Sequence, residues 1–121
     1  MPFKSLLNRL LEDIPGAVGA IIIDWEGEAV DQVARINEYE IKLLGAHSSI
    51  ILSHLKEALS HIDSGELVEV VINTGENKTL IVPLTEDYLL VLQLGPLAIV
   101  ARAGYKARRC VAELRHVFAF D

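Results

Sequence analysis

The most constraining feature of the sequence is a long amphipathic segment, residues 38–63, that carries two apolar stripes. Asn37 supplies an N-cap before this segment and Ser64-Gly65 a stop after it, so the segment is predicted to form one helix. At about 100° per residue, one stripe runs the whole length of the helix and should face a sheet. That stripe comprises Ile41, Leu44, Ile51, Leu52, Leu55, Ala58, Leu59 and Ile62.

The second apolar group lies on the opposite side of the first half of this helix. It consists of Tyr39, Leu43, Ala46 and Ile50. A helix packed on one sheet needs only one apolar stripe, so two stripes predict two buried faces. One interpretation is that a loop or a neighbouring helix covers the second group. We favour a second copy of the chain, because small oligomers are mostly two-fold symmetric.

Turn-forming residues divide the rest of the chain into short segments. Helical spacing predicts helices at residues 3–14 and 97–118, and apolar, partly β-branched runs predict strands at 17–23, 28–34, 66–72, 78–84 and 88–94. The order is therefore α-β-β-α-β-β-β-α, and hairpin-length connections imply antiparallel pairing. These features predict an α+β fold in which a five-stranded antiparallel sheet has helices on both faces. At 121 residues, a single domain spanning 1–121 is expected.

The strand predicted at residues 66–72 is apolar on both faces. An exposed edge strand of this kind is an aggregation hazard, and pairing with the same strand of a second subunit would remove the edge. The alternative is an interior strand. Together with the second helix stripe, this strand defines a predicted dimer interface. It consists of Tyr39, Leu43, Ala46, His47, Ile50, His54, Leu67, Val68, Val70 and Val71.

The charge distribution is uneven along the chain. The net charge of −6 argues against general nucleic-acid binding, yet residues 98–121 carry five basic and two acidic side chains. Arg102, Lys106 and Arg109 share the solvent side of the last predicted helix with His116. One interpretation is a solvated polar face. The other is docking of an acidic protein surface or an anionic membrane, and the membrane version is weaker because that face lacks bulky apolar residues.

Residues that could carry catalysis or bind a metal are few. No GxxxxGK[ST] or GxSxG motif occurs, and Cys110 is the only cysteine and lies on the apolar side of the last helix. His47, His54 and His61 recur every seventh residue, about 10.5 Å apart, which is too far for two of them to share one metal. We interpret this histidine row as a polar margin of the interface or as a pH-dependent dimer contact. No cofactor, metal or enzymatic activity is predicted.

Targeting signals are not evident either. The N-terminal segment is amphipathic, unlike a signal peptide, and no stretch approaches the roughly 18 uncharged apolar residues that a membrane-spanning helix needs. The expected compartment is the cytoplasm.

Two segments resemble the Roadblock/dynein light chain family. LEDIPGAVGAIIIDWEGEAV is similar to the opening of that domain, where a helix ends in Gly, an apolar strand follows, and an acidic-x-x-Gly turn leads into the second strand. IVPLTEDYLLVLQLGPLAIVARAGYKA resembles its closing strand pair and final helix. The order of elements agrees over nearly the full length.

The resemblance implies a homodimer in which the long helices pack together and the third strands pair into a continuous sheet. Bacterial members similar to the mutual gliding protein B act on a small Ras-like GTPase. The resemblance therefore implies a non-enzymatic platform that regulates or scaffolds such a GTPase, without an arginine finger of its own. Two alternatives stay open. One is a structural light-chain or scaffold subunit that does not affect nucleotide turnover; the other is a ligand-sensing domain of the profilin-like or PAS-like type.

Overall fold

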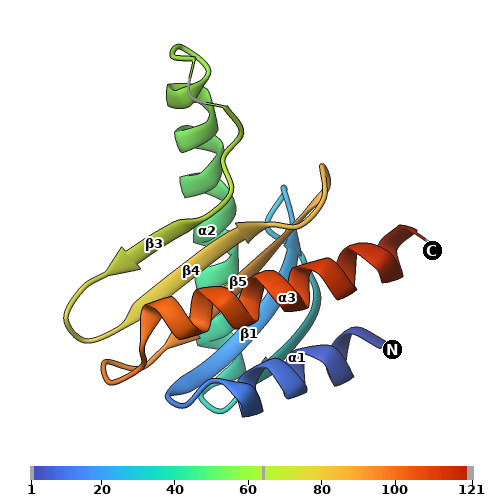
Figure 1. The fold of residues 1–121 in the computed structure, drawn as a ribbon, viewed down its shortest axis with the longest axis vertical. Helices are drawn as coiled ribbons and strands as arrows, with labels where there is room; N and C mark the ends of the chain where they lie inside the picture. Colours follow the sequence, from blue (N-terminus) through green and yellow to red (C-terminus); the bar gives the residue numbers. More distant parts are fainter. Residues whose placement is uncertain (1, 64, 120–121) are drawn as a thin grey trace.

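The computed structural model describes residues 2–63 and 65–119 and confirms the predicted order of elements (Figure 1). The elements are α1 Pro2–Asp13, β1 Ala17–Asp24, β2 Ala29–Ala34, α2 Glu38–Leu59, β3 Val70–Asn73, β4 Lys78–Pro83, β5 Tyr88–Leu94 and α3 Val100–Ala119. The strands form one five-stranded antiparallel sheet in the order β2-β1-β5-β4-β3. The chain therefore has the predicted α+β architecture, with β2 and β3 at the two edges.

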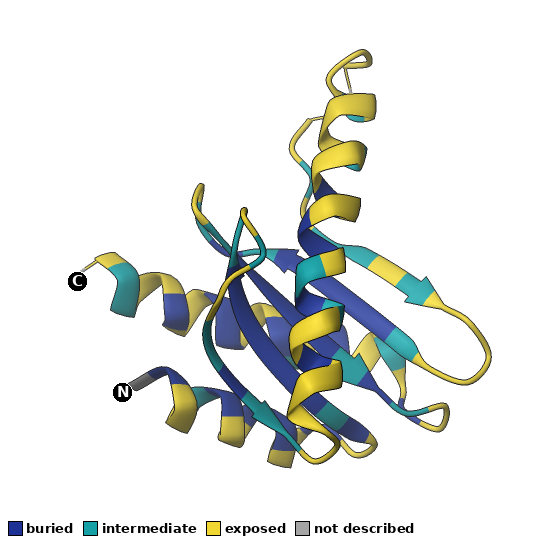
Figure 2. Ribbon diagram, turned by 180° about the vertical axis from the view of Figure 1, so that it is seen from behind, coloured by how far each residue is buried: buried dark blue, intermediate teal, exposed yellow. Residues whose placement is uncertain are grey.

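The sheet separates two apolar cores. Helices α1 and α3 cover one face of the sheet and α2 crosses the other (Figures 1 and 2). The α1–α3 core includes Leu7 and Leu11 of α1 and Leu114 of α3, and Phe118 stacks on Phe3 and Tyr88 with ring centroids 4.8 and 4.6 Å apart. The core under α2 is smaller, and its buried members are Ile21, Ile23, Ile41, Leu52, Ile81, Leu89 and Val91.

The residues of α2 that face the sheet differ from the prediction. Small residues, Gly45, Ser48 and Ser49, are buried there between Ile41 and Leu52. The two serine hydroxyls donate to carbonyl oxygens one turn back in the helix, at 2.7 and 2.8 Å, so no polar group is left unpaired by their burial. Small side chains let α2 approach β1 closely.

The predicted sheet-facing stripe was therefore wrong over the second half of α2. Beyond Leu52 the helix projects past the sheet, as Figure 1 shows, and its residues are exposed or half-buried. Leu44 is also only half-buried. The remaining stripe members that are not buried are Ile51, Leu55, Ala58, Leu59 and Ile62.

Gly45 gives a direct test of this close approach. A Cβ atom at Gly45 would lie 2.9 Å from Cγ2 of Ile23, and both partners are held in the core. We expect Gly45→Val to lower the free energy of unfolding by about 1–3 kcal/mol through overpacking. Helix propensity alone predicts the opposite sign, because Val forms helix better than Gly by a few tenths of a kcal/mol. Urea denaturation measures the change, and a stabilised variant would contradict this packing.

Two element boundaries differ from the predicted ones for identifiable reasons. Helix α2 ends at Leu59 and not at residue 63, because the backbone bonds beyond it are one residue shorter: the N–H groups of His61 and Ile62 donate to the carbonyl oxygens of Ala58 and Leu59. Of the predicted Ser64-Gly65 stop, Ser64 lies outside the described residues, and Gly65 adopts a positive φ of 83°. Helix α3 begins at Val100 and not at residue 97, because residues 95–98 form a turn closed by the Ala98 N–H and the Gly95 carbonyl oxygen.

The third strand is shorter than predicted, and Pro83 explains why. The N–H of Leu84 donates to the Tyr88 carbonyl oxygen, so Leu84 directs its backbone groups toward β5. Bonding direction alternates along a strand, so Pro83 faces β3, where it has no N–H to donate. The ladder between β3 and β4 consequently starts at Val70, paired with Ile81, and residues 66–69 are not part of the strand.

Candidate interaction surface

The outer face of α2 is apolar and open to solvent. Tyr39 and Ile50 expose 69% and 56% of their surface, and Leu43 and Ile51 are also exposed. Figure 2 shows the exposed residues along the side of α2 that faces away from the sheet. Scattered apolar residues are normal on a surface, but a row along one helix face marks an interaction site.

The second exposed feature is the outer edge of β3, the edge strand of the sheet next to β4. The N–H of Thr74 donates to the Asn77 carbonyl oxygen, and alternation then points the N–H and C=O of Val71 away from β4. Helix α2 lies over β1, β2 and β5, so it leaves Val70 and Ile72 only half-buried. Both the backbone and the side chains of β3 are therefore available to a partner.

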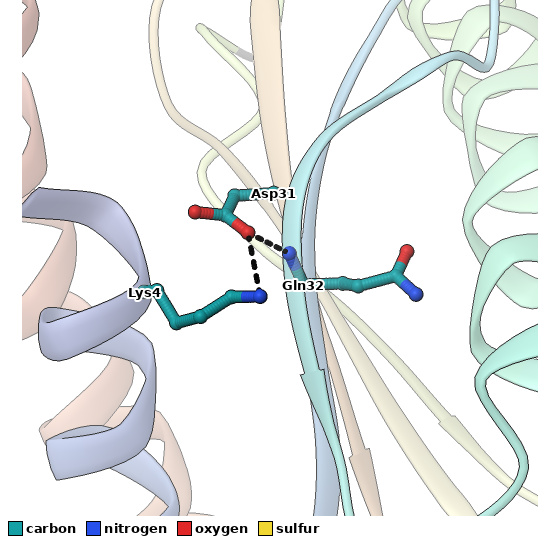
Figure 3. Close-up of polar contacts among 3 residues, drawn as sticks. All are labelled: Lys4, Asp31 and Gln32. Atoms are coloured by element: carbon teal, nitrogen blue, oxygen red, sulfur yellow. Dashed lines mark hydrogen bonds and ion pairs between the residues drawn. The ribbon is translucent and has the colours of Figure 1, made fainter. Parts of the chain in front are cut away.

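The opposite edge of the sheet, β2, is closed by a side chain. Figure 3 shows the carboxylate of Asp31, whose Oδ1 accepts the N–H of Gln32 at 2.8 Å and lies 3.6 Å from Nζ of Lys4 on α1. A strand adding to this edge would have to displace the carboxylate and then face its charge, and both devices discourage edge pairing. Of the two edge strands, β3 is the one whose outward N–H and C=O groups are open to a partner strand.

The predicted interface residues all remain at the molecular surface, although to different degrees. Ala46, Leu67 and Val70 are half-buried. Ala46 lies against the β1–β2 turn, where a Cβ atom at Gly27 would be 3.3 Å from its Cα. The exposed members of the predicted set are Tyr39, Leu43, His47, Ile50, His54, Val68 and Val71.

Two of the three histidines, His47 and His54, lie on α2, and His61 lies in the turn after it. His47, His54 and His61 are all exposed. No group of three or more His, Cys, Asp or Glu within residues 2–63 and 65–119 is arranged to hold a metal ion. His47 and His54 stand three residues before and four residues after Ile50, so they would neighbour any partner that covers this face.

Cys110 is a core residue between α1 and α3. Its side chain is 7% exposed, and burial, with a smaller contribution from Glu113 and an opposing one from Arg9, raises the pKa of the thiol to about 11. Because the thiolate is the nucleophile, iodoacetamide at pH 8 should alkylate the folded protein roughly a hundredfold more slowly than the protein in urea. Mass spectrometry measures the rate of alkylation. Equal rates in the folded protein and in the protein in urea would contradict the burial of Cys110.

The basic residues of α3 lie on the opposite face of the sheet from α2. Arg102 and Arg109 are exposed, and Lys106 is half-buried. Lys106 and Arg109 line a hollow of about 200 Å³ between α1 and α3. The prediction that this side of α3 lacks bulky apolar residues was wrong, because Tyr105 is half exposed and its hydroxyl accepts a hydrogen bond from Arg109 at 3.3 Å.

Two features of these surfaces escaped the sequence analysis. The small residues of α2 recur at positions i, i+3 and i+4 from Gly45, so their helical spacing was visible, but periodicity is normally sought in large apolar residues. The orientation of Leu97, which is 93% exposed, depends on a contact with distant Lys78 and has no local signal.

Comparison with known proteins identifies related domains. The family model of the Roadblock/LC7 domain matches residues 4–94. The structure resembles the Roadblock/LC7 domain from Streptomyces avermitilis, with a TM-score of 0.87 at 18% identity over 95% of this chain and 96% of that chain. It also resembles Myxococcus xanthus MglB, with a TM-score of 0.90 at 12% identity over 100% and 98% of the two chains.

A more distant likeness confirms the wider fold class. Acanthamoeba castellanii profilin IA superposes with a TM-score of 0.60 at 16% identity, covering 94% of this chain and 97% of that one. No curated protein matches the sequence. Within the described part of the chain, none of the helices has the length and hydropathy required to cross a membrane.

Proposed function

The chain belongs to the Roadblock/LC7 domain family, and from this membership we propose that it is a homodimeric binding platform for a small Ras-like GTPase. The observation that supports the dimer most directly is the pairing of an exposed apolar helix face with an open strand edge. Ile50 on α2 and Val71 on β3 represent these two features. In a dimer, both would be removed from water by the same partner.

A two-fold axis beside β3 satisfies both features at once. Antiparallel pairing of β3 with its copy joins the two sheets edge to edge and pairs the outward N–H and C=O of Val71. An axis perpendicular to the sheet keeps both α2 helices on the same side of the joined sheet, where exposed apolar side chains of each helix can contact the partner subunit. The half-buried side chains of Val70 and Ile72 would then lie beneath the partner's helix. The association buries apolar area, which favours it at roughly 25 cal/mol per Å² before the cost of association.

The proposed partner follows from the family and not from a catalytic group in this chain. The resemblance to bacterial Roadblock proteins implies action on a Ras-like GTPase, and the likeness to MglB supports it. A platform of this kind acts by holding the switch segments of the GTPase in one conformation, while the GTPase supplies the groups that contact the nucleotide. Its effect on turnover is therefore exerted through conformation.

The first test is the solution mass by multi-angle light scattering over a concentration series. The proposal expects a mass of twice the 13.3 kDa chain across the micromolar range. A monomer at every concentration would contradict it. Such a result would mean that a second copy of the chain does not cover the outer face of α2.

The second test separates regulation from scaffolding. Phosphate release and nucleotide exchange of the Ras-like GTPase from the source organism are measured with and without a saturating amount of the protein. A changed rate of either step supports regulation. Binding without any change in rate supports a structural subunit, and no binding contradicts the choice of partner.

A ligand-sensing role is disfavoured by the packing of α2. A sensor of the profilin-like or PAS-like type would hold its ligand between helix and sheet. Here Gly45 packs so closely on Ile21 and Ile23 that a single added carbon atom would approach within 2.9 Å of a side-chain methyl group. The middle of α2 therefore leaves no room for a ligand above β1.

A further inference from the structure

The turn before α3 holds a leucine in solvent. Leu97 is 93% exposed, whereas the next residue, Ala98, is buried. Nζ of Lys78 donates to the carbonyl oxygens of Pro96 and Ala98, at 3.1 and 2.9 Å, and so bonds the backbone on both sides of Leu97. The leucine is therefore displayed from a fixed turn, and a fixed apolar side chain can enter a partner's pocket at little cost in entropy.

Two more exposed apolar side chains and three cations follow Leu97, just before α3 and along it. Ile99 and Tyr105 expose 65% and 50% of their surface. Arg102 follows Ile99 by three residues and precedes Tyr105 by three, so the three side chains are neighbours on one side of the helix. We call the complete set the α3 patch. It consists of Leu97, Ile99, Arg102, Tyr105, Lys106 and Arg109.

The cations of the α3 patch have no acidic partners within residues 2–63 and 65–119. Ion pairs in that part of the chain include Lys4–Asp31, Arg9–Glu113 and Arg108–Glu69, and these do not involve Arg102, Lys106 or Arg109. Arg102, Lys106 and Arg109 instead stand at positions i, i+4 and i+7, along about 10.5 Å of helix. Three charges in such a row match three acidic side chains at the same spacing on a second helix.

A furrow between α1 and α3 lies next to this row. Its hollow of about 200 Å³ has Lys106 and Arg109 on the α3 side, Leu6 and Leu10 of α1 in its lining, and Asp13 and Glu113 as its acidic members. Glu113 is already paired with Arg9 across the furrow at 3.6 Å. Asp13 is its remaining acidic group, so with Lys106 and Arg109 the furrow carries a net positive charge.

We propose that the α3 patch docks an acidic amphipathic helix of a partner protein. The helix would place apolar side chains on Leu97, Ile99 and Tyr105 and carboxylates on the cation row. A protein segment fits better than an anionic membrane, because the whole chain carries a net charge of −6, which repels such a surface. The patch lies on the opposite sheet face from α2, so this docking does not compete with the proposed dimer contact.

The probe for this proposal is a fluorescein-labelled synthetic helical peptide. It carries a Leu stripe flanked by Glu at i, i+4 and i+7, and two control peptides carry Gln or Lys at those three positions. Fluorescence anisotropy at low ionic strength should show that the Glu peptide binds the protein roughly tenfold or more tightly than the Gln peptide. The affinity should fall as salt is added.

Charge exchange makes the test specific to the α3 patch. The variant Arg102→Glu/Lys106→Glu/Arg109→Glu should lose binding of the Glu peptide and gain binding of the Lys peptide, more strongly than a variant of equal net charge. A matched variant, Arg35→Glu/Lys42→Glu/Lys56→Glu, changes the net charge equally at exposed cations elsewhere and should still bind the Glu peptide. Leu97→Ser should weaken binding, and Leu97→Met should retain it.

Three outcomes would overturn the proposal. One is equal binding of the Glu and Gln peptides, and another is equal loss of binding in the two charge-reversed variants. The third is sedimentation of the protein with phosphatidylglycerol–phosphatidylcholine vesicles through the same residues in the absence of peptide binding. That result would assign the α3 patch to a membrane surface.

Discussion

Replacing Ile50 with Asp should convert the dimer into a monomer. Ile50 is 56% exposed in the single chain and would be covered by the partner's α2 in the proposed assembly. A carboxylate buried there without a partner costs about 3 kcal/mol or more, which weakens the dissociation constant by about a hundredfold or more. Because the interface is two-fold symmetric, each dimer carries the substitution twice. Light scattering over a dilution series measures the shift.

The matched control for this variant is Ile99→Asp. Ile99 has a similar exposed fraction, 65%, but lies immediately before α3, on the other face of the sheet. The same substitution there should leave the dimer intact. If Ile99→Asp dissociates the dimer and Ile50→Asp does not, the interface has been assigned to the wrong face.

Replacing Val71 with Pro should also abolish the dimer while leaving the monomer folded. The N–H of Val71 points away from β4, so a proline ring there removes no hydrogen bond within the chain. Between two copies it removes a donor from each strand, at about 1 kcal/mol per bond, and places ring atoms where the partner backbone must lie. Circular dichroism should show an ordinary thermal transition, and light scattering should show a monomer.

Two further substitutions make the Val71 result specific. Val71→Thr keeps the N–H and the branched side chain and should remain dimeric. Ile72→Pro removes a donor that points toward β4 and should destabilise the fold itself. A dimer that survives Val71→Pro but not Ile50→Asp would show that the helices associate and the strands do not.

Much of the fold could be predicted because local sequence patterns indicate its helices, strands and turns. Glycine and proline mark the turns, and the period of the apolar residues separates helix from strand, so the element order and the antiparallel sheet were confirmed. Neither signal depends on knowing which segments meet in space.

The features that could not be predicted depend on contacts between segments that are distant in the sequence. Pro83 shortens β3 only because the register places its missing N–H opposite that strand. Leu97 stays in solvent because Lys78, far away in sequence, bonds the carbonyl groups on either side of it. The sheet-facing side of α2 was assigned wrongly because its closest contact is made by Gly45, which periodicity does not score.

The carboxylate of Asp31 has a consequence for the size of the assembly. A sheet with two open edges can add a copy at each side, and repeated addition would grow into a filament of unlimited length. In this chain the β2 edge is blocked, because Oδ1 of Asp31 already accepts the hydrogen bond from the Gln32 N–H. In the proposed dimer, growth through β3 would therefore stop after a single addition, and the assembly would be finite.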